Sequence, residues 1–244
     1  MVNFLIDIGN SNSKVAFEEN GKIGEIAKNS ELDILSFILS VIKETSINII
    51  VLSNVREDDA NMERVLKRKC KKLIVLNNTT KLPINLKYGF SANTLGADRI
   101  AAALAIAMLF PNKDCIKFDF GTALTIDYID KNGEYKGGNI SLGLQSRFKA
   151  LNAFTKRLPL INPDTIFPEI GTTTTGAITA GVVLGLIFEV EGYIKKSSNY
   201  TVIFTGGDAF YFAKKLKNTI FVVQNLVLIG LAQIADYYAD CNKN

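Results

Sequence analysis

The sequence predicts an α/β fold built from two copies of one supersecondary unit. Two observations support this: a motif that occurs twice, and strands that alternate with helices along the chain. The first copy reads FLIDIGNSNSKVAFEENGKIGEI and the second reads IKFDFGTALTIDYIDKNGEYKGG. Asp7 and Gly9 match Asp119 and Gly121 at the same spacing, and each copy continues to an Asn-Gly pair. A repeat of this length indicates two duplicated domains rather than an array of short repeats.

Each copy is predicted to form three strands. The first is apolar, at residues 4–6 and 116–120, so it should be buried and rigid. It ends in Asp-x-Gly, a second strand follows, and an Asn-Gly turn leads into the third. Asn-Gly accepts positive φ at both turn positions, which favours a tight hairpin.

The rest of the first half predicts alternating helices and strands. Residues 32–43 predict an amphipathic helix because leucine and isoleucine recur there at helical spacing. Further elements are expected as an apolar strand at 47–52, a polar helix at 58–69, a strand at 73–76 and an Ala-rich helix at 100–110. Pro111-Asn112 ends that last helix, so we expect domains at 1–110 and 111–244.

After its three strands, the second half predicts a loop-rich insert at 158–174, which contains three of the five prolines. Helices are expected at 176–188, near 209–216 and up to residue 238, with strands at 202–205 and 220–223. This alternation is typical of α/β layers.

Small residues mark one face of the helix expected at 176–188. Ala177, Gly181 and Gly185 are four residues apart, so they share that face. They permit close helix packing, either within the core or across a dimer interface.

Composition excludes several classes of function. The chain has 244 residues, 48% of them hydrophobic, and a net charge of +4, which suits a substantial core and is too small to imply nucleic acid. The basic run at 67–72 lacks interleaved aromatics and is typical of a solvated helix end. There is no histidine, which excludes Ser-His-Asp and Cys-His catalysis, and there is no Walker A or GxGxxG motif.

Three separated cysteines without a CxxC pattern indicate a reducing compartment, and no segment is typical of a targeting sequence. The longest apolar stretch, 176–188, is shorter than the about 20 residues needed to cross a bilayer. We therefore expect a cytoplasmic protein with neither a membrane nor a nucleic-acid partner.

The repeated turns contain the residue types that a phosphate site needs. Each Asp ends a rigid strand and stays ionised at neutral pH, and each Gly lets a ligand approach the backbone closely. The polar residues that can donate to phosphate oxygens are Asn10, Ser11, Ser13, Lys14, Thr122 and Thr125. Ordinary β-turns also use Asp and Gly, but two copies with matching hairpins favour a cleft for a nucleotide phosphate and its cation.

The tetrad Gly96-Ala97-Asp98-Arg99 opens an apolar helix, whose N-terminal amides and dipole attract anions. Asp98 could orient a substrate hydroxyl or cap its own helix. The pair Gly206-Gly207 follows a strand, where it could lie against an adenine ring or form an ordinary strand-to-helix turn. Of the four threonines at 172–175, one is expected to be an N-cap, and the others could face a polar substrate.

The segments DIGNSNSK, GADR, DFGTALT, GTTTTGAITAG and FTGGDA occur in that order. Together they resemble the motifs of type III pantothenate kinases, in the superfamily of actin, the heat-shock chaperone ATPases, and the acetate and sugar kinases. The resemblance spans nearly the whole chain. It implies two duplicated ribonuclease-H-like (actin-like ATPase) domains, each a mixed sheet flanked by helices, with an interdomain cleft. The first domain would carry one phosphate loop, and the second would carry the other loop and the adenosine motif.

The resemblance also implies an activity, namely ATP-dependent phosphorylation of pantothenate to 4′-phosphopantothenate, the first step of coenzyme A biosynthesis. It implies Mg2+, a monovalent cation (K+ or NH4+) and a homodimer.

Roles for individual residues follow from the same resemblance. Asp98 would be the catalytic base, and the substrate contacts would be Gly96, Ala97, Asp98, Arg99, Thr174 and Tyr88. The ATP contacts would be Asp7, Ile8, Gly9, Asn10, Ser11, Asn12, Ser13, Lys14, Thr122, Gly206 and Gly207. Asp119 would bind the monovalent cation, and Asp7 would lie near Mg2+, directly or through water.

The chain departs from the family pattern in three places. Ser11 replaces the usual threonine and keeps its hydroxyl. Tyr88 lies eight residues before Gly96 instead of seven, and the proline that often follows is absent. Thr172-Thr173 stand where the family often has Lys-Asn or Arg-Asn.

Two other functions on the same fold remain open. One is an ATPase or another small-molecule kinase, and the other is a non-catalytic regulatory or accessory protein. Retention of Asp7, Asp98 and Asp119 favours catalysis, whereas strong salt-dependent DNA binding would favour the regulatory protein.

Overall fold

The structure is a computed structural model that describes residues 1–30, 33–83, 95–162 and 167–241. Its contacts divide the chain into two compact units. Unit 1 comprises residues 1–112, 131–135 and 225–244, and unit 2 comprises residues 113–130 and 136–224.

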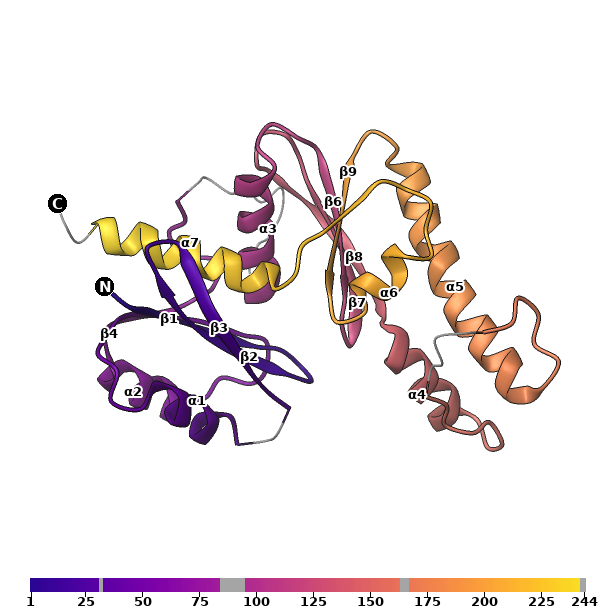
Figure 1. Ribbon diagram of the computed structural model, residues 1–244, viewed down its shortest axis with the longest axis horizontal. Coiled ribbons are helices and arrows are strands. Elements are labelled where there is room, and N and C mark those ends of the chain that lie inside the picture. The colour runs from indigo at the N-terminus through magenta and orange to yellow at the C-terminus, as the bar shows by residue number, and fades with distance from the viewer. Residues whose placement is uncertain (31–32, 84–94, 163–166, 242–244) are drawn as a thin grey trace. The chain divides into compact units, whose positions relative to one another are not determined.

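Unit 1 contains a mixed five-stranded sheet in the order β3-β2-β1-β4-β5 (Figure 1). Its strands are β1 (Asn3–Ile8), β2 (Ser13–Glu19), β3 (Lys22–Asn29), β4 (Ile47–Asn54) and β5 (Cys70–Val75). The central strand β1 runs antiparallel to β2 and parallel to β4. The three-stranded β1–β2–β3 unit is the one that the repeated motif predicts, and the parallel strand β4 makes the sheet mixed, as the resemblance implies.

Helices cover both faces of this sheet. Successive residues of β1 point to opposite faces, so alternate residues pack against different helices. Phe4 and Ile6 pack in one cluster with residues of α1 (Ile34–Ile42) and α2 (Ala60–Arg68). Leu5 packs in a second cluster with residues of α3 (Ala97–Leu109) and α7 (Leu226–Cys241). Asp33 and Asp59 cap α1 and α2, which fixes their starts slightly inside the predicted ranges.

Unit 2 repeats the strand order as β8-β7-β6-β9-β10. Its strands are β6 (Cys115–Phe120), β7 (Ala123–Ile129), β8 (Tyr135–Leu142), β9 (Thr201–Gly206) and β10 (Ile220–Val222). The central strand β6 is antiparallel to β7 and parallel to β9, as β1 is to β2 and β4. The predicted α/β fold with two duplicated mixed sheets is therefore confirmed.

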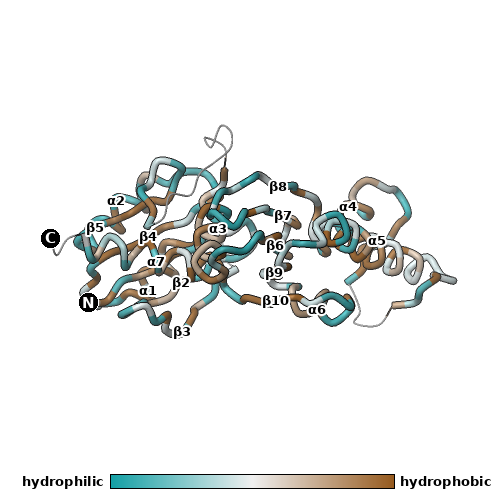
Figure 2. Tube along the Cα trace, turned by 90° about the horizontal axis from the view of Figure 1, so that it is seen from above, coloured by the Kyte–Doolittle hydropathy of each residue, from teal (hydrophilic) through white to brown (hydrophobic). Residues whose placement is uncertain are grey.

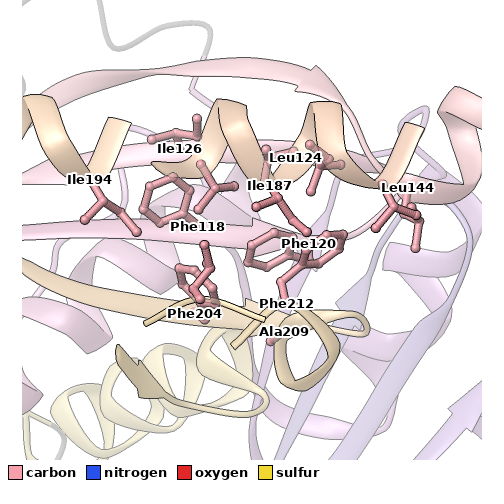
Figure 3. Packing of buried hydrophobic residues seen from close by; sticks show 14 of the residues in the cluster. Phe118, Phe120, Leu124, Ile126, Leu144, Ile187, Ile194, Phe204, Ala209 and Phe212 are labelled. Carbon is pink, nitrogen blue, oxygen red and sulfur yellow. The ribbon is translucent and has the colours of Figure 1, made fainter. Parts of the chain in front are cut away.

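Aromatic rings fill the core of unit 2 (Figure 3). Phe120 of β6 lies 4.8 Å, between ring centroids, from both Phe204 of β9 and Phe212 of α6 (Ala209–Ala213). Ile187 and Ile194 of α5 (Thr174–Lys196) pack in the same cluster. This cluster holds the central strand rigid along its length.

Helix α4 (Leu144–Phe154) is absent from the sequence prediction. Only Leu144 and Phe148 are buried in it, so it carries a single pair of core residues instead of an extended amphipathic pattern.

Helix α5 is longer than predicted, since it runs for 23 residues and ends at Lys196. The expectation that this segment is too short to span a bilayer is therefore wrong on length. By length and composition α5 alone, among the described helices, qualifies as a membrane span, with half of its apolar window buried. Val183, Leu186 and Val190 lie in the core cluster, and hydrophobic and neutral residues alternate along α5 in Figure 2. These contacts support the expected role as a core helix.

The contact units and the expected domains at 1–110 and 111–244 differ at the C-terminus. Helix α7 packs against α3 and β4, so it belongs to unit 1. The alanines of α3 are buried and let α7 approach closely. At the closest point, a Cβ on Gly230 would lie only 2.0 Å from the carbonyl oxygen of Ala101.

Replacing Gly230→Ala should destabilise unit 1 by about 1–3 kcal/mol, because the added methyl forces α3 and α7 apart. The matched control is Gly192→Ala on α5, where an added Cβ meets nothing within 4 Å. That change should be neutral or stabilising by up to about 1 kcal/mol, because alanine favours helix. Urea denaturation measures both; equal stability of the two variants would contradict the close contact.

Candidate active site

The first Asp-x-Gly turn joins β1 to β2 and is closed by its own backbone. The amide of Gly9 donates to the carbonyl of Asn12 at 3.0 Å. Two bonds tie this turn to the end of β4: Arg56 Nε donates to the Gly9 carbonyl at 2.9 Å, and the Val55 amide donates to the Ile8 carbonyl at 3.1 Å. The turn is thus fixed at the carboxyl ends of two parallel strands, where open α/β sheets bind ligands.

The residues of the first turn differ in exposure. Residues 10–12 are exposed, whereas Asp7 and Lys14 are half-buried and face each other in the β1–β2 register. Lys14 Nζ donates to Asn225 Oδ1 at 3.1 Å. Ser13 is 1% exposed, so its side chain is less accessible to a ligand than its neighbours are.

The GADR tetrad lies beside this turn within unit 1. Gly96 is the N-cap of α3, and Asp98 Oδ1 accepts from the Arg99 amide at 2.8 Å. A Cβ on Gly96 would lie 2.6 Å from Asp98 Oδ1 and 3.9 Å from Val55 Cγ1. The glycine therefore gives the carboxylate room at the helix start, next to the end of β4. The structure brings Asp98 and the first turn to the same edge of one sheet.

Helix α4 supports the second turn, which joins β6 to β7. The Gly143 amide and Ser146 Oγ both donate to the Thr122 carbonyl, at 3.0 and 2.6 Å. A Cβ on Gly143 would lie 2.0 Å from the carbonyl oxygen of Gly121, so no side chain fits there. The sequence prediction missed both supports. The sequence offered one signal of these contacts, the glycine at position 143, directly after the third strand of the repeated motif.

The start of α4 also contributes electrostatically. Its N-cap, Gly143, makes no side-chain hydrogen bond, so the first amides of the helix are not covered by a capping side chain. A helix N-terminus carries partial positive charge. Beside the second turn, that charge favours an anion.

The Gly206-Gly207 pair lies against the same turn. Gly206 has φ of +91°, and a Cβ on it would lie 2.5 Å from Asp119 Oδ1 and 2.6 Å from the Phe120 amide nitrogen. The Asp208 amide donates to the Phe120 carbonyl at 3.3 Å. The structure therefore gathers Asp119, the second turn and Gly206-Gly207 at one edge of the unit 2 sheet.

A buried ion pair lies next to Asp119. Lys117 Nζ is 2.6 Å from Asp127 Oδ2 and 4.0 Å from Asp119 Oδ2. The sequence prediction did not identify either Lys117 or Asp127 as important. The sequence offered one signal of this ion pair, the charged Lys117 within an otherwise apolar strand.

The predicted threonine site lies at the start of α5. Thr173 is the N-cap of α5, since its Oγ1 accepts from the Gly176 amide at 3.1 Å. Thr174 is exposed at the first helical position. Thr174 lies in unit 2 and the GADR tetrad in unit 1. Tyr88 lies outside the residues that the structure describes.

The small residues of α5 are not packed in the core. A Cβ on Gly181 or Gly185 would meet nothing within 4 Å, and Phe188 beside them is 62% exposed. A groove of about 570 Å³ runs between α4 and α5, and Phe154 on its wall is 89% exposed. Among the described residues, Gly181 and Gly185 therefore have no close partner in unit 2, whereas Ala177 of the same stripe packs against Gly171.

The described residues contain no group of three or more His, Cys, Asp or Glu side chains placed to hold a metal. Mg2+ often binds through one or two carboxylates together with substrate phosphates, and it keeps several waters. The single carboxylate of Asp7, the residue expected near Mg2+, fits that mode of binding better than a metal cage made by protein alone.

The model of the type III pantothenate kinase family matches residues 3–196 of this chain. Over 245 residues the chain is 40% identical to a type III pantothenate kinase of Phocaeicola vulgatus, covering 97% of this chain and 98% of that protein. It is also 40% identical to the one of Cytophaga hutchinsonii, with 97% and 99% covered.

Solved structures share the fold at lower identity. A Baf-family transcriptional activator from Campylobacter jejuni has a TM-score of 0.61 at 23% identity, covering 97% of this chain and 99% of that one. The activator of 2-hydroxyisocaproyl-CoA dehydratase from Clostridium difficile, solved with ADPNP, has a TM-score of 0.60 at 15% identity, with 100% and 98% covered. These similarities show that the fold of this chain is shared with both structures.

Replacing Asp208→Asn should stabilise the protein at neutral pH. Burial raises the pKa of the Asp208 carboxyl, so the ionised form is disfavoured in the folded state. Because the pKa of this carboxyl is higher in the folded state than in the unfolded state, its ionisation reduces the stability of the fold. The reduction is absent below the unfolded pKa of about 4 and develops as the pH rises through the folded value. The variant should therefore exceed wild type in urea stability at pH 7 and match it near pH 4.

An exposed carboxylate in the same unit provides the control, Glu169→Gln, which should show no such convergence. A stability difference for Asp208→Asn that widens toward low pH would refute the effect of burial.

Proposed function

The chain belongs to the type III pantothenate kinase family, and from that premise we propose how its residues transfer phosphate from ATP to pantothenate. The reaction forms 4′-phosphopantothenate at the start of coenzyme A biosynthesis. One observation carries the assignment of residues: Asp98 lies at the same sheet edge as the first phosphate turn, beside an anion-attracting helix start.

We assign the phosphates of ATP to two sets of residues. In unit 1 these are Asp7 to Lys14, of which the exposed residues 10–12 are the most accessible. In unit 2, Thr122 would contact the phosphates, and Gly206-Gly207 would contact the adenosine. The bare backbone at both glycine turns supports this assignment, because phosphate and a flat base can approach it closely.

Asp98 is proposed to act on the acceptor hydroxyl. Its carboxylate accepts a hydrogen bond from that hydroxyl and directs the oxygen at the γ-phosphorus. Phosphoryl transfer has a loose transition state, so position and charge neutralisation matter more than basicity. Arg99 has a planar fork that suits the carboxylate of pantothenate. Thr174 and Tyr88 complete the proposed substrate contacts.

Two cations belong to the proposal. Asp7, directly or through water, would hold Mg2+, which offsets phosphate charge when bound. Asp119 would hold K+ or NH4+, and its oxygen donors suit such an ion. The Lys117 ammonium faces Oδ2 of this carboxylate, so the ion would bind on the Oδ1 side.

The direct test measures ADP release by purified protein with ATP and Mg2+, with and without pantothenate. Release that depends on pantothenate is expected. Release that is indifferent to pantothenate would indicate an ATPase or another acceptor, and no release would contradict catalysis.

Asp98→Asn should bind ATP normally and lower kcat by roughly 100-fold or more, because the neutral amide is a weaker hydrogen-bond acceptor and no longer holds the acceptor hydroxyl in line with the γ-phosphorus. Isothermal titration with ATP separates binding from turnover. The matched control is Asp58→Asn, an exposed carboxylate in the same unit, which should keep wild-type kcat. Near-normal turnover of Asp98→Asn would refute the assigned role.

A homodimer is also proposed, with the outer face of α5 at the interface. The open stripe of Gly181 and Gly185, the exposed Phe188 and the groove beside α4 together form an apolar surface that a second copy would cover. We further propose a cytoplasmic location, as the substrates of such a kinase require.

Phe188→Glu should convert the dimer to a 26.8 kDa monomer, because it places a charge in the buried apolar interface. Light scattering after gel filtration measures the mass. Lys195→Glu, exposed near the end of α5, is the control that should remain dimeric. A wild-type mass of one chain would contradict the proposal.

A further inference from the structure

A buried hydroxyl lies beside the first Asp-x-Gly turn. Ser53 is the last residue but one of β4, and it is 0% exposed. Its Oγ makes no hydrogen bond with any of the residues that the structure describes. The large majority of buried side-chain polar atoms have a partner, so an exception at the sheet edge that carries the proposed phosphate turn calls for an explanation.

The side chains of Ser53 and Asp7 point to the same face of the sheet. The parallel strands β1 and β4 are neighbours (Figure 1), and their register pairs Leu5 with Val51 and Asp7 with Ser53. Leu5 and Val51 pack in the cluster that also contains residues of α3 and α7. Because residues two apart in a strand share a face, Asp7 and Ser53 form the next pair on that face, at the end of the strands.

The second copy of the motif has the same pairing. In unit 2, Asp119 of β6 pairs in register with Thr205 of the parallel strand β9. Thr205 is 3% exposed, so a buried hydroxyl residue lies beside the Asp-x-Gly aspartate in both units. Each hydroxyl residue directly follows a run of apolar residues in its strand, where alanine or valine would avoid burying a polar atom. The recurrence indicates a use for the hydroxyl at the aspartate.

We propose that Ser53 is a positioning residue for Asp7 when ATP and Mg2+ bind. Its hydroxyl donates a hydrogen bond to the Asp7 carboxylate and holds it in the orientation that Mg2+, or a water bound to Mg2+, requires. A carboxylate has about four lone-pair sites, so Asp7 can accept this bond in addition to the interactions that it already makes. This role rests on the proposed ATP site and adds a residue of β4 to it.

The hydroxyl of Ser53 should weaken the fold and strengthen nucleotide binding. A buried polar atom without a partner carries its full desolvation penalty, whereas a hydrogen bond to an ionised group is among the stronger ones. Hydrogen-bond partners orient the carboxylates that bind metals, and losing such a partner typically weakens metal binding by about 10- to 100-fold. A hydroxyl that served only the fold would have the opposite effects.

The test uses Ser53→Ala, which removes only Oγ. The matched control is Ile49→Val, because Ile49 lies four residues earlier on the same face of β4 and is also 0% exposed. That change removes one methylene from the core and leaves the end of the strand intact. Circular dichroism first establishes that each variant is folded.

The affinity for ATP is obtained from the rise in melting temperature with ATP concentration, because a ligand that binds only the folded state stabilises it. With Mg2+ present, Ser53→Ala should bind ATP at least about ten-fold more weakly than wild type, and Ile49→Val should match wild type. In EDTA all three proteins should have the same affinity, because the hydroxyl acts on the carboxylate that faces Mg2+. Unchanged affinity of Ser53→Ala with Mg2+, or an equal loss in EDTA, would overturn the inference.

A second readout needs neither ATP nor Mg2+. The urea midpoint of Ser53→Ala should equal or exceed that of wild type, because alanine removes a buried polar atom that has no partner among the described residues. The midpoint of Ile49→Val should be lower, because the change leaves a small cavity. A midpoint of Ser53→Ala as low as that of Ile49→Val would mean that the hydroxyl supports the fold, and it would overturn the inference.

The combined results distinguish the role of Ser53 from the kinase activity. If Ser53→Ala loses Mg2+-dependent affinity for ATP but pantothenate does not stimulate ADP release by wild type, the proposed function fails and the role of Ser53 stands. If ADP release depends on pantothenate and Ser53→Ala binds ATP as wild type does, only the role of Ser53 fails. Absence of ATP binding by wild type would overturn both.

Discussion

One steric constraint governs unit 2: at the end of β6, neighbouring segments approach so closely that only glycine fits at two positions. The Asp119 carboxylate occupies the space that a side chain at position 206 would need, and the Gly121 carbonyl does the same at position 143. Because both glycines are present, the second turn, the Gly206-Gly207 pair and the start of α4 converge on one edge of the sheet. Any larger residue at position 206 or 143 would separate these parts.

Unit 1 reaches the same geometry by different contacts. Its sheet has the same strand order, but hydrogen bonds from Val55 and Arg56 fix its turn, and a helix that starts with Gly96 stands beside it. The two copies therefore share a frame and differ in what surrounds the Asp-x-Gly turn. This difference agrees with the proposed division of tasks, in which the acceptor binds to unit 1 and the adenosine to unit 2.

Sequence patterns predicted most of the fold because the central strands are continuous apolar runs and the Asn-Gly hairpins are local signals. They missed α4, whose only two buried residues give almost no periodicity, and they shortened α5, because Glu189 and Glu191 interrupt its apolar run. At the site, motif and position single out Asp98 and Asp119 as candidates in the sequence. Gly143 and Lys117 were not singled out, since their contacts depend on where α4 starts and on the register in which β6 pairs with β7.

The return of α7 to unit 1 has a consequence for biosynthesis. Its partner α3 and the central strand β1 emerge from the ribosome long before residue 226, so unit 1 cannot bury its second core until α7 has been synthesised. Unit 2 is almost continuous in sequence and is available to fold earlier. The apolar face of α3 is meanwhile uncovered, which makes the nascent N-terminal half a natural client for chaperones.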